Sequence, residues 1–435
     1  MSGLGGVLVG LSAAALSGLA LGHGMLSGLS KAEKLAWSLA LGLLVQAALF
    51  LLLVTLRPGA DPALSFSLIC AALVALLLRR RRRAETPSRP AAPPLPFSVR
   101  WLLAAAGAGV ALFLIVAVSE PMWTTDYLAV WGLKAKTIFT TASVPARLFH
   151  DPETPWSDPE YPLLLPLDLA ALAVWARGWD DRALALLYPL CQTATAAAAF
   201  GFLARRGRVL GGAVAAALVA CFFPLYAPAH VGMAEIVLAL GLVLLSTALL
   251  DAFEADSGAA RARLAIASLF CVATKLEGAL FADLAALLWL VARPRGRAWA
   301  PVLAALLVPP VAHRALMYLA RGSVPARDFD VALLGPSRWG QWLGRIAEAV
   351  SRIASVEVVA AAIPLAALAG FFLVTRRSFA DRLLPLLGAQ VVVYVVACSL
   401  SAFGVVWLVT AWFAQITWTL FPPLTVVLGA RVVET

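Results

Sequence analysis

Two acidic residues stand where long apolar runs meet hydrophilic sequence. Asp126 follows the apolar run 101–118, within the stretch SEPMWTTDYLAVWGLKAKTIF, and Glu235 opens another apolar run five residues after His230. Two carboxylates on one face of a membrane are the minimum for general-base catalysis, or for holding a divalent metal ion that assists group transfer. The structural alternative is that each acid lies in the first turn of a helix, where a negative charge stabilises the helix dipole.

Basic residues accompany both acids. Lys134 and Lys136 follow Asp126, and Lys275 precedes Glu277 in the largely apolar stretch CVATKLEGALFADLAALLW. A charge inside the hydrocarbon costs about 2.5–3.5 kcal/mol on insertion scales, so such residues are either functional or neutralised in an ion pair. Both interpretations stay open for Lys275 and Glu277.

The two lysines after Asp126 cannot act alike. Lys134 and Lys136 are two positions apart, and side chains with that spacing on a helix point about 200° away from each other. Only one of them can face a bound ligand, while the other extends toward lipid headgroups. Lys134 is expected to face the ligand, because it lies eight positions after Asp126 and nearly shares its helix face. The alternative is a surface helix on which both lysines extend toward headgroups.

The sequence contains no other pattern that carries chemistry. It has no phosphate-binding glycine loop, no array of Cys and His with metal-ligand spacing, and no serine in a Gly-flanked turn. The 4 histidines are far apart, and the 5 cysteines lie inside apolar runs, where they fit as small core residues. The charged residues near the ends of apolar runs are therefore the candidates for function.

The composition identifies an integral membrane protein. Of the 435 residues, 62% are hydrophobic and only 13% are charged, and the mean hydropathy is +0.89. Soluble proteins have roughly a quarter charged residues. The net charge of +10 lies in short clusters between apolar runs, of which Arg79–Arg83 is the strongest. This positive-inside pattern indicates topology and contact with membrane lipids, and it argues against nucleic-acid binding.

We expect an all-α, polytopic fold with about 13 transmembrane helices, since a span needs roughly 20 apolar residues. The expected spans are 4–22, 37–56, 63–79, 101–118, 182–204, 207–226, 233–251, 262–275, 278–293, 299–319, 356–375, 383–400 and 416–431. A further apolar run, 162–177, is interrupted by Pro162, Pro166 and Asp168. If this run crossed the membrane, Arg205 and its neighbours would lie outside, against the positive-inside rule. We therefore expect 162–177 not to span.

This topology divides the chain into three parts. They are N-terminal helices with a basic cytoplasmic linker (1–100), a central module with amphipathic helices in its outer loop 119–160 (101–300), and C-terminal helices with an outer loop 320–355 (301–435). Asp126 and Glu235 then share the outer face. The abundance of Ala, Leu, Arg and Gly is typical of GC-rich bacterial genomes, so we expect a multi-pass protein of the bacterial cytoplasmic membrane whose site faces outward.

Four motifs in order resemble a known family. The stretches DYLAVWGLKAKTIF, PEYPLLLPLDLAAL, HVGMAEIVLAL and ATKLEGALF, within residues 120–285, look like those of membrane glycosyltransferases of the GT-C fold. The likeness is to the bacterial relatives of protein O-mannosyltransferases and aminoarabinose transferases. No single motif is specific, so the resemblance depends on their order, and a looser likeness continues to residue 431.

The resemblance implies an inverting transfer of a sugar from a polyprenyl-phosphate donor to a glycan, lipid or protein acceptor. It implies that Asp126 is the catalytic base and that Glu235, where relatives usually carry Asp, is the second acid of the site. Both would also be the ligands of a divalent metal ion, if one is used. Donor phosphate would be bound by Lys134, Lys136 and Lys275, and substrate would contact Trp131, Tyr161, His230, Glu277 and Gln415.

Three features depart from the family's pattern. Leu276 replaces an Asn, Gln415 stands seven residues before Pro422 where many relatives carry an Arg, and the spans before residue 100 have no counterpart. Loss of a phosphate-pairing Arg means either that another cation, such as Arg314 or Arg338, takes its role, or that the chain is an inactive relative that serves in assembly.

A multi-span transporter of a small or lipid-linked substrate is the main alternative. The interrupted run 162–177 and the charge of Asp168 at membrane depth favour it. The sequence shows no inverted repeat between its two halves, and its distinctive polar residues gather on one face, which favours the transferase.

Overall fold

The computed structural model describes residues 3–56, 95–145, 161–255, 257–292, 299–321, 331–352, 377–400 and 418–432, with the single residues 372, 375 and 405. Throughout this part of the chain the regular structure is helical, and it contains no strand. The all-α fold predicted from the sequence is confirmed.

The α-helices are α1 (Leu4–Leu21), α2 (Lys31–Leu56), α4 (Phe97–Ser119), α5 (Gly132–Thr141), α7 (Leu164–Ala176), α8 (Asp181–Leu184), α9 (Leu187–Arg205), α10 (Val209–Ala220), α11 (Ala234–Glu254), α12 (Gly258–Thr274), α13 (Leu276–Ala292), α14 (Trp299–Arg321), α16 (Leu384–Leu400) and α19 (Phe421–Arg431). A π-helix, η1 (Tyr127–Trp131), precedes α5. The short 3-10 helices are η3 (Pro228–His230), η4 (Val331–Leu334), η5 (Pro336–Arg338) and η6 (Phe379–Leu383).

The described residues support part of the predicted set of membrane spans. Within the described residues, 6 helical segments are long and apolar enough to cross: Leu4–Leu21, Lys31–Leu56, Phe97–Ser119, Asp181–Arg205, Ala234–Glu254 and Phe379–Leu400. The expected spans 63–79 and 356–375 lie outside the described residues, apart from Phe372 and Thr375. Other expected spans contain helices of limited length, such as α10 with 12 residues and α19 with 11. A total of 13 spans stays a prediction.

The interrupted run at 162–177 forms α7, which has 13 residues. At 1.5 Å per residue, this helix is about 20 Å long and falls short of the roughly 30 Å of hydrocarbon. It is buried along its length and packs against α1, α2 and α5. Its length and its protein cover support the prediction that this segment does not span the membrane.

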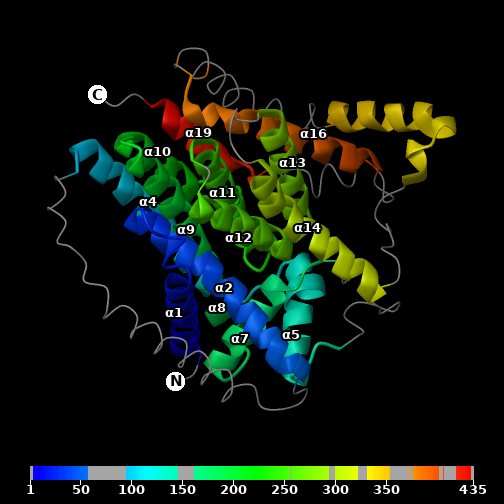
Figure 1. Cartoon of the computed structure of the whole chain (residues 1–435). Helices are drawn as coiled ribbons and strands as arrows, with labels where there is room; N and C mark the ends of the chain where they lie inside the picture. The colour runs from blue at the N-terminus through cyan, green and yellow to red at the C-terminus, as the bar shows by residue number, and fades with distance from the viewer. Residues whose placement is uncertain are drawn as a thin grey trace.

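The two N-terminal helices are part of the helical bundle. α1 and α2 approach closely at Gly18 and Gly42, where an added Cβ would meet backbone of the other helix at 1.9 and 2.0 Å. Small residues permit such backbone contact between membrane helices. α2 also packs on α7 and α9, and in Figure 1 it crosses the bundle from the upper left to the lower right. α1 and α2, which the family that the sequence resembles does not have, thus pack directly on helices of the central module.

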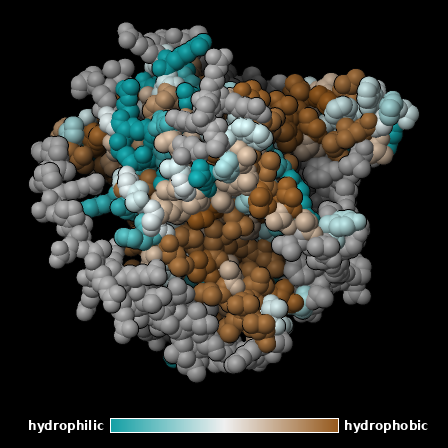
Figure 2. All heavy atoms as spheres, viewed as in Figure 1, coloured by the Kyte–Doolittle hydropathy of each residue, from teal (hydrophilic) through white to brown (hydrophobic). Residues whose placement is uncertain are grey.

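The surface of the bundle is largely apolar. Figure 2 shows a broad hydrophobic area across the centre, with hydrophilic atoms gathered mainly at the upper left. The large hydrophobic side chains that are exposed include Leu52 and Leu56 on α2, Leu112 and Ile115 on α4, and Val291 on α13. Apolar surface of this kind is typical of helices that face lipid.

α11 is the central helix of the bundle. The most apolar 18-residue stretch of this helix is 100% buried, and the helix packs against α9, α12, α13 and α19. Glu235 lies in its first turn and Asp251 in its last, about 24 Å apart along the helix axis. Both carboxylates are buried, so each requires a charged or hydrogen-bonding partner. We refer to the two ends of the bundle as the Glu235 end and the Asp251 end.

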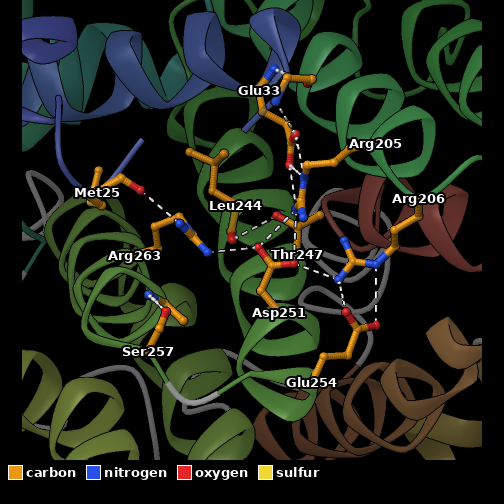
Figure 3. Close-up of polar contacts among 12 residues, drawn as sticks. Met25, Glu33, Arg205, Arg206, Leu244, Thr247, Asp251, Glu254, Ser257 and Arg263 are labelled. Carbon is orange, nitrogen blue, oxygen red and sulfur yellow. Dashed lines mark hydrogen bonds and ion pairs between the residues drawn. The ribbon is translucent and has the colours of Figure 1, made fainter. Parts of the chain in front are cut away.

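Asp251 is held by three arginines (Figure 3). Its Oδ1 lies 3.0 Å from Nη2 of Arg205 and 2.7 Å from Nη2 of Arg206, and its Oδ2 lies 3.1 Å from Nη2 of Arg263. Arg205 also donates two bonds from Nε and one from Nη2 to the carboxylate of Glu33, at 3.0 to 3.2 Å. This Asp251 cluster joins α2, α9, α11 and α12.

Two further contacts complete the Asp251 cluster. Arg206 Nη2 donates to Glu254 Oε2 at 2.7 Å, and Arg263 Nη1 donates to the carbonyl oxygen of Met25 at 2.8 Å. Three guanidinium groups thus meet three carboxylates, so the charges balance. Bidentate and charge-assisted bonds of this kind are the strong class of hydrogen bonds.

Removal of the Asp251 carboxylate should be costly. Asp251→Asn leaves three arginines with too little counter-charge, so the free energy of unfolding should fall by about 3–5 kcal/mol. Denaturation of the purified chain in detergent, followed by circular dichroism, measures the change. Asp283→Asn is the matched control, because Asp283 pairs with Arg314 through side chains that are 30% and 50% exposed. That variant should lose less than about 1 kcal/mol, and equal losses in the two variants would contradict a structural role for the cluster.

Candidate functional site

The segment after α4 forms the helix that the sequence predicted at Asp126. Thr124 Oγ1 accepts a hydrogen bond from the backbone N–H of Tyr127 at 3.3 Å, and so caps the helix start. The helix begins at Thr125, passes through the π-helix η1 and continues as α5. π-helical turns are frequent at functional sites. Asp126 immediately precedes this turn and is half-buried.

Lys134 and Lys136 differ in exposure, as their spacing predicts. Lys134 is 0% exposed and lies on the buried face of α5 with Ala135 and Ile138, whereas Lys136 is exposed. The two side chains therefore occupy different environments. Binding of phosphate by Lys134 stays a prediction.

Tyr127, which the sequence patterns did not single out, fixes this helix to two other elements. Its hydroxyl donates a short hydrogen bond to Asp181 Oδ1 at the start of α8, and Trp179 Nε1 donates to the same oxygen at 2.9 Å. Burial and the neighbouring Asp181 raise the pKa of Tyr127, so its phenol stays neutral and can donate. The ring also lies against Gly232, where an added Cβ would come within 2.9 Å of ring atoms. Gly232 stands in the turn just before Glu235. This contact therefore brings the helix that begins at Thr125 beside the start of α11.

Lys275 joins two of the predicted acids. It stands in extended conformation between the end of α12 at Thr274 and the start of α13 at Leu276. Its Nζ lies 2.6 Å from Glu235 Oε1 and 3.2 Å from Glu277 Oε1. Lys275, Glu235 and Glu277 are only 2%, 1% and 4% exposed. These three residues form the Lys275 cluster, in which two carboxylates share one ammonium group.

Aromatic rings connect the Lys275 cluster to η1, the π-helix that contains Trp131. The rings of Trp131 and Tyr161 are stacked, with centroids 5.2 Å apart and planes 8° from parallel. Lys275 Nζ lies 5.9 Å from the centroid of Tyr161, at the outer limit of a cation–π contact. The residues predicted at 131, 161 and 275 therefore form a continuous row, although the chain separates them widely.

His230 also lies at the Glu235 end and can form hydrogen bonds. It lies in η3, is 8% exposed, and meets the ring of Trp418 edge-on with centroids 5.2 Å apart. Burial lowers the pKa of His230; Glu235 opposes this shift and Lys275 adds to it. The imidazole is therefore neutral at neutral pH. Within the described residues, His230 Nδ1 and Glu277 Oε2 have no hydrogen-bond partner, so the carboxylate oxygen can accept a hydrogen bond from a ligand and the imidazole nitrogen can accept or donate one.

The remaining predicted residues contribute less to this arrangement. Gln415 lies outside the described residues. Arg314 pairs with Asp283, and Arg338 Nε donates to Gln341 at 3.2 Å, so neither contact joins the Lys275 cluster. No group of three His, Cys, Asp or Glu side chains that could hold a metal occurs among the described residues. A divalent ion at Asp126 and Glu235 stays an expectation from the sequence.

Comparison with protein-family models, with curated proteins and with solved structures finds no match to this chain. The site must therefore be interpreted from its own geometry.

The ion pair between Lys275 and Glu235 can be measured by a double-mutant cycle. Lys275→Met leaves two buried carboxylates without a counter-charge and should lower the free energy of unfolding by about 3–5 kcal/mol. In Lys275→Met/Glu235→Gln one of these charges is gone, so the loss should be at least about 1 kcal/mol smaller than the sum of the single losses. Lys136→Met, at an exposed lysine, should change stability by no more than about 0.5 kcal/mol. Strictly additive losses would contradict the ion pair.

Proposed function

We propose that the chain is an inverting glycosyltransferase of the bacterial inner membrane. It moves a sugar from a polyprenyl-phosphate donor to a hydroxyl acceptor on the non-cytoplasmic face. The observation that supports this function is the meeting of four distant segments at the Glu235 end. Trp131, Tyr161, Glu235 and Lys275, one from each motif of the family resemblance, are linked there by stacking, cation–π and ion-pair contacts.

The distribution of arginine supports an outward-facing site. Arg205, Arg206 and Arg263 gather at the Asp251 end, where Arg431 also pairs with Asp381 at 2.7 Å. Cytoplasmic ends of membrane proteins carry the excess of arginine and lysine. The Glu235 end, opposite these arginines, is then the non-cytoplasmic one.

Asp126 is the best base among the acids of this end. It is half-buried and so within reach of an acceptor, whereas Glu235 and Glu277 are buried and held by Lys275. In the reaction, the acceptor oxygen forms a bond to the anomeric carbon, and its proton passes to the Asp126 carboxylate. The bond between that carbon and the phosphate oxygen breaks, and the prenyl phosphate leaves with the electron pair. Attack opposite the leaving group inverts the anomeric centre.

The leaving phosphate dianion requires a cation in a preorganised position. Lys275 suits this role less well than the sequence predicts, because two carboxylates already share its charge and phosphate would compete with them. Lys134, on the helix that carries Asp126, stays the candidate for this role, and its side chain, which is 0% exposed, must turn toward the donor to reach the phosphate. Lys275 instead holds Glu235 and Glu277 in place through ion pairs, where Glu277 and His230 can bind hydroxyl groups.

Transport is the second candidate, and one observation favours it. Asp168 in α7 is 1% exposed and accepts a hydrogen bond from Gln46 Nε2 of α2 at 3.3 Å. A carboxylate buried at membrane depth is typical of proton-coupled or cation-coupled pathways. The transferase accounts for the Glu235 end but assigns no role to Asp168.

The test of the transferase is Asp126→Asn. In proteoliposomes supplied with polyprenyl phosphates that carry mannose, glucose or aminoarabinose, this variant should lose at least about 100-fold in transfer rate, since general-base catalysis contributes about 10²–10⁴-fold. Its thermal unfolding should match that of the unmodified chain. Asp180→Asn is the control, because Asp180 is an acid of the same end whose side chain only caps α8. Full activity of Asp126→Asn would contradict the proposal, whereas uptake that depends on Asp168 without any transfer would favour the transporter.

Neutralising the two lysines separately tests the phosphate site. Lys134→Gln should weaken the binding of a prenyl phosphate by about 10- to 100-fold, the worth of a charged hydrogen bond. Lys136→Gln should change it less than about twofold, because an exposed charge is screened by water and salt. Binding is measured by isothermal calorimetry on the chain in nanodiscs, with circular dichroism to establish folding. Equal, small effects in the two variants would exclude Lys134 as the phosphate ligand.

A further inference from the structure

A cleft of about 210 Å³ opens beside the candidate site, where α4 ends. It lies between the end of α4, the extended segment that leads to Asp126, and the turn that contains η3. Its lining includes Ser119, Glu120 and Trp123 on one side and Pro228 and Val231 on the other. We call it the Glu120–Trp123 cleft. At about 30 Å³ per water molecule, its volume corresponds to roughly seven waters, enough for one sugar ring.

The chemistry of the lining selects against anions. Glu120 is exposed and negative, and among the described residues no lysine, arginine or histidine belongs to the lining. A phosphate or carboxylate would therefore be repelled. The indole of Trp123 is 52% exposed and offers a flat apolar face, next to a carboxylate that accepts hydrogen bonds. The ring of an uncharged sugar has apolar C–H groups on its faces and hydroxyl groups around its edge. It can therefore stack on the indole and donate hydrogen bonds to the carboxylate.

The position of the cleft indicates a ligand that is anchored in the membrane. The helix below it, α4, is only 17% buried over its apolar window, and Leu112 and Ile115 are 61% and 64% exposed. An acyl or prenyl chain can lie along this apolar surface while its headgroup lies in the cleft. The lining of the cleft is also close in sequence to Asp126 and His230 of the candidate site. Trp123 is three residues before Asp126, and Val231 directly follows His230.

We propose that the Glu120–Trp123 cleft binds the uncharged sugar headgroup of a membrane-anchored glycolipid. Its role as the acceptor of sugar transfer depends on the proposed function, but binding in the cleft does not. The cleft presents the headgroup beside the Asp126 carboxylate, and the absence of cations from its lining keeps the donor phosphate out of the acceptor position.

Photolabelling in nanodiscs tests the binding. The full chain is irradiated with a diazirine-bearing glucosyl diacylglycerol or, separately, with phosphatidic acid that carries the same acyl chains, and labelled peptides are identified by mass spectrometry. The glucosyl lipid should label residues 112–123 at least fivefold more than phosphatidic acid does. Trp123→Ala should reduce this labelling about tenfold. The control is Trp101→Ala, at a tryptophan that is 64% exposed and lies near the start of α4, at the opposite end of that helix from the cleft, and it should leave labelling unchanged.

Charge at the cleft provides a second measurement. Glu120→Gln keeps a hydrogen-bonding group but removes the negative charge, so labelling by phosphatidic acid should rise severalfold, while the glucosyl lipid is still bound. Equal labelling by the two lipids in the unmodified chain would show a general lipid groove and overturn the proposal. Unchanged labelling in Trp123→Ala would overturn it as well, because Trp123 would then serve only as an interfacial anchor.

Failure of the proposed function would look different. Asp126→Asn should label with the glucosyl lipid like the unmodified chain, because binding needs no base. If labelling depends on Trp123 but no sugar transfer occurs with any donor, the transferase fails and the cleft stands. If transfer occurs and Trp123→Ala leaves the KM for a glucosyl lipid acceptor unchanged, the cleft fails and the transferase stands.

Discussion

The arrangement of the molecule depends on the charges at the two ends of α11. A helix buried on all sides in an apolar bundle can carry a carboxylate only where a counter-charge meets it. Lys275 meets Glu235 at one end, and three arginines meet Asp251 at the other. These contacts fix how α2, α9, α12 and α13 stand around α11. They also determine which polar groups are left over for chemistry, because the break between α12 and α13 places Glu277 beside the same lysine.

Much of the helical architecture follows from local sequence. Apolar runs predict the positions of α1, α4, α11 and α16 to within a few residues, since the hydrophobic pattern decides burial. Helical spacing likewise predicts that Lys134 and Lys136 have different surroundings, and the structure buries the first and exposes the second. Helix position and the burial of a side chain on one helix depend mainly on local sequence. They can therefore be predicted from a single sequence.

Contacts between distant segments were harder to predict. The sequence leaves Glu235 either as a helix cap or as a functional acid, and Lys275 either as a phosphate ligand or as an ion-pair partner, because spacing along the chain does not reveal which helices touch. The structure joins the two residues. The contact between Tyr127 and Asp181 had no signal at all, since 54 positions separate the two residues and the motif that contains Tyr127 gives its tyrosine no partner. The total of 13 spans stays a prediction for a related reason: hydropathy measures the apolar character of α10 or α19 but not the length of their helices, which have only 12 and 11 residues.

The two fixed ends of α11 bear on the choice between transferase and transporter. Alternating access requires that helices move past one another, and each end of α11 would then have to separate buried charges at a cost of several kcal/mol unless both clusters moved as rigid units. A transferase has no such requirement, because a lipid-borne donor and a lipid-borne acceptor can diffuse to a rigid site from the surrounding bilayer. Preorganised groups are also what stabilises a developing phosphate charge most effectively. The buried Asp168–Gln46 contact belongs to neither cluster, but α2, which carries Gln46, is itself tied to the Asp251 cluster through Glu33. Rigid clusters at both ends of the central helix thus favour chemistry at the Glu235 end over passage through the bundle.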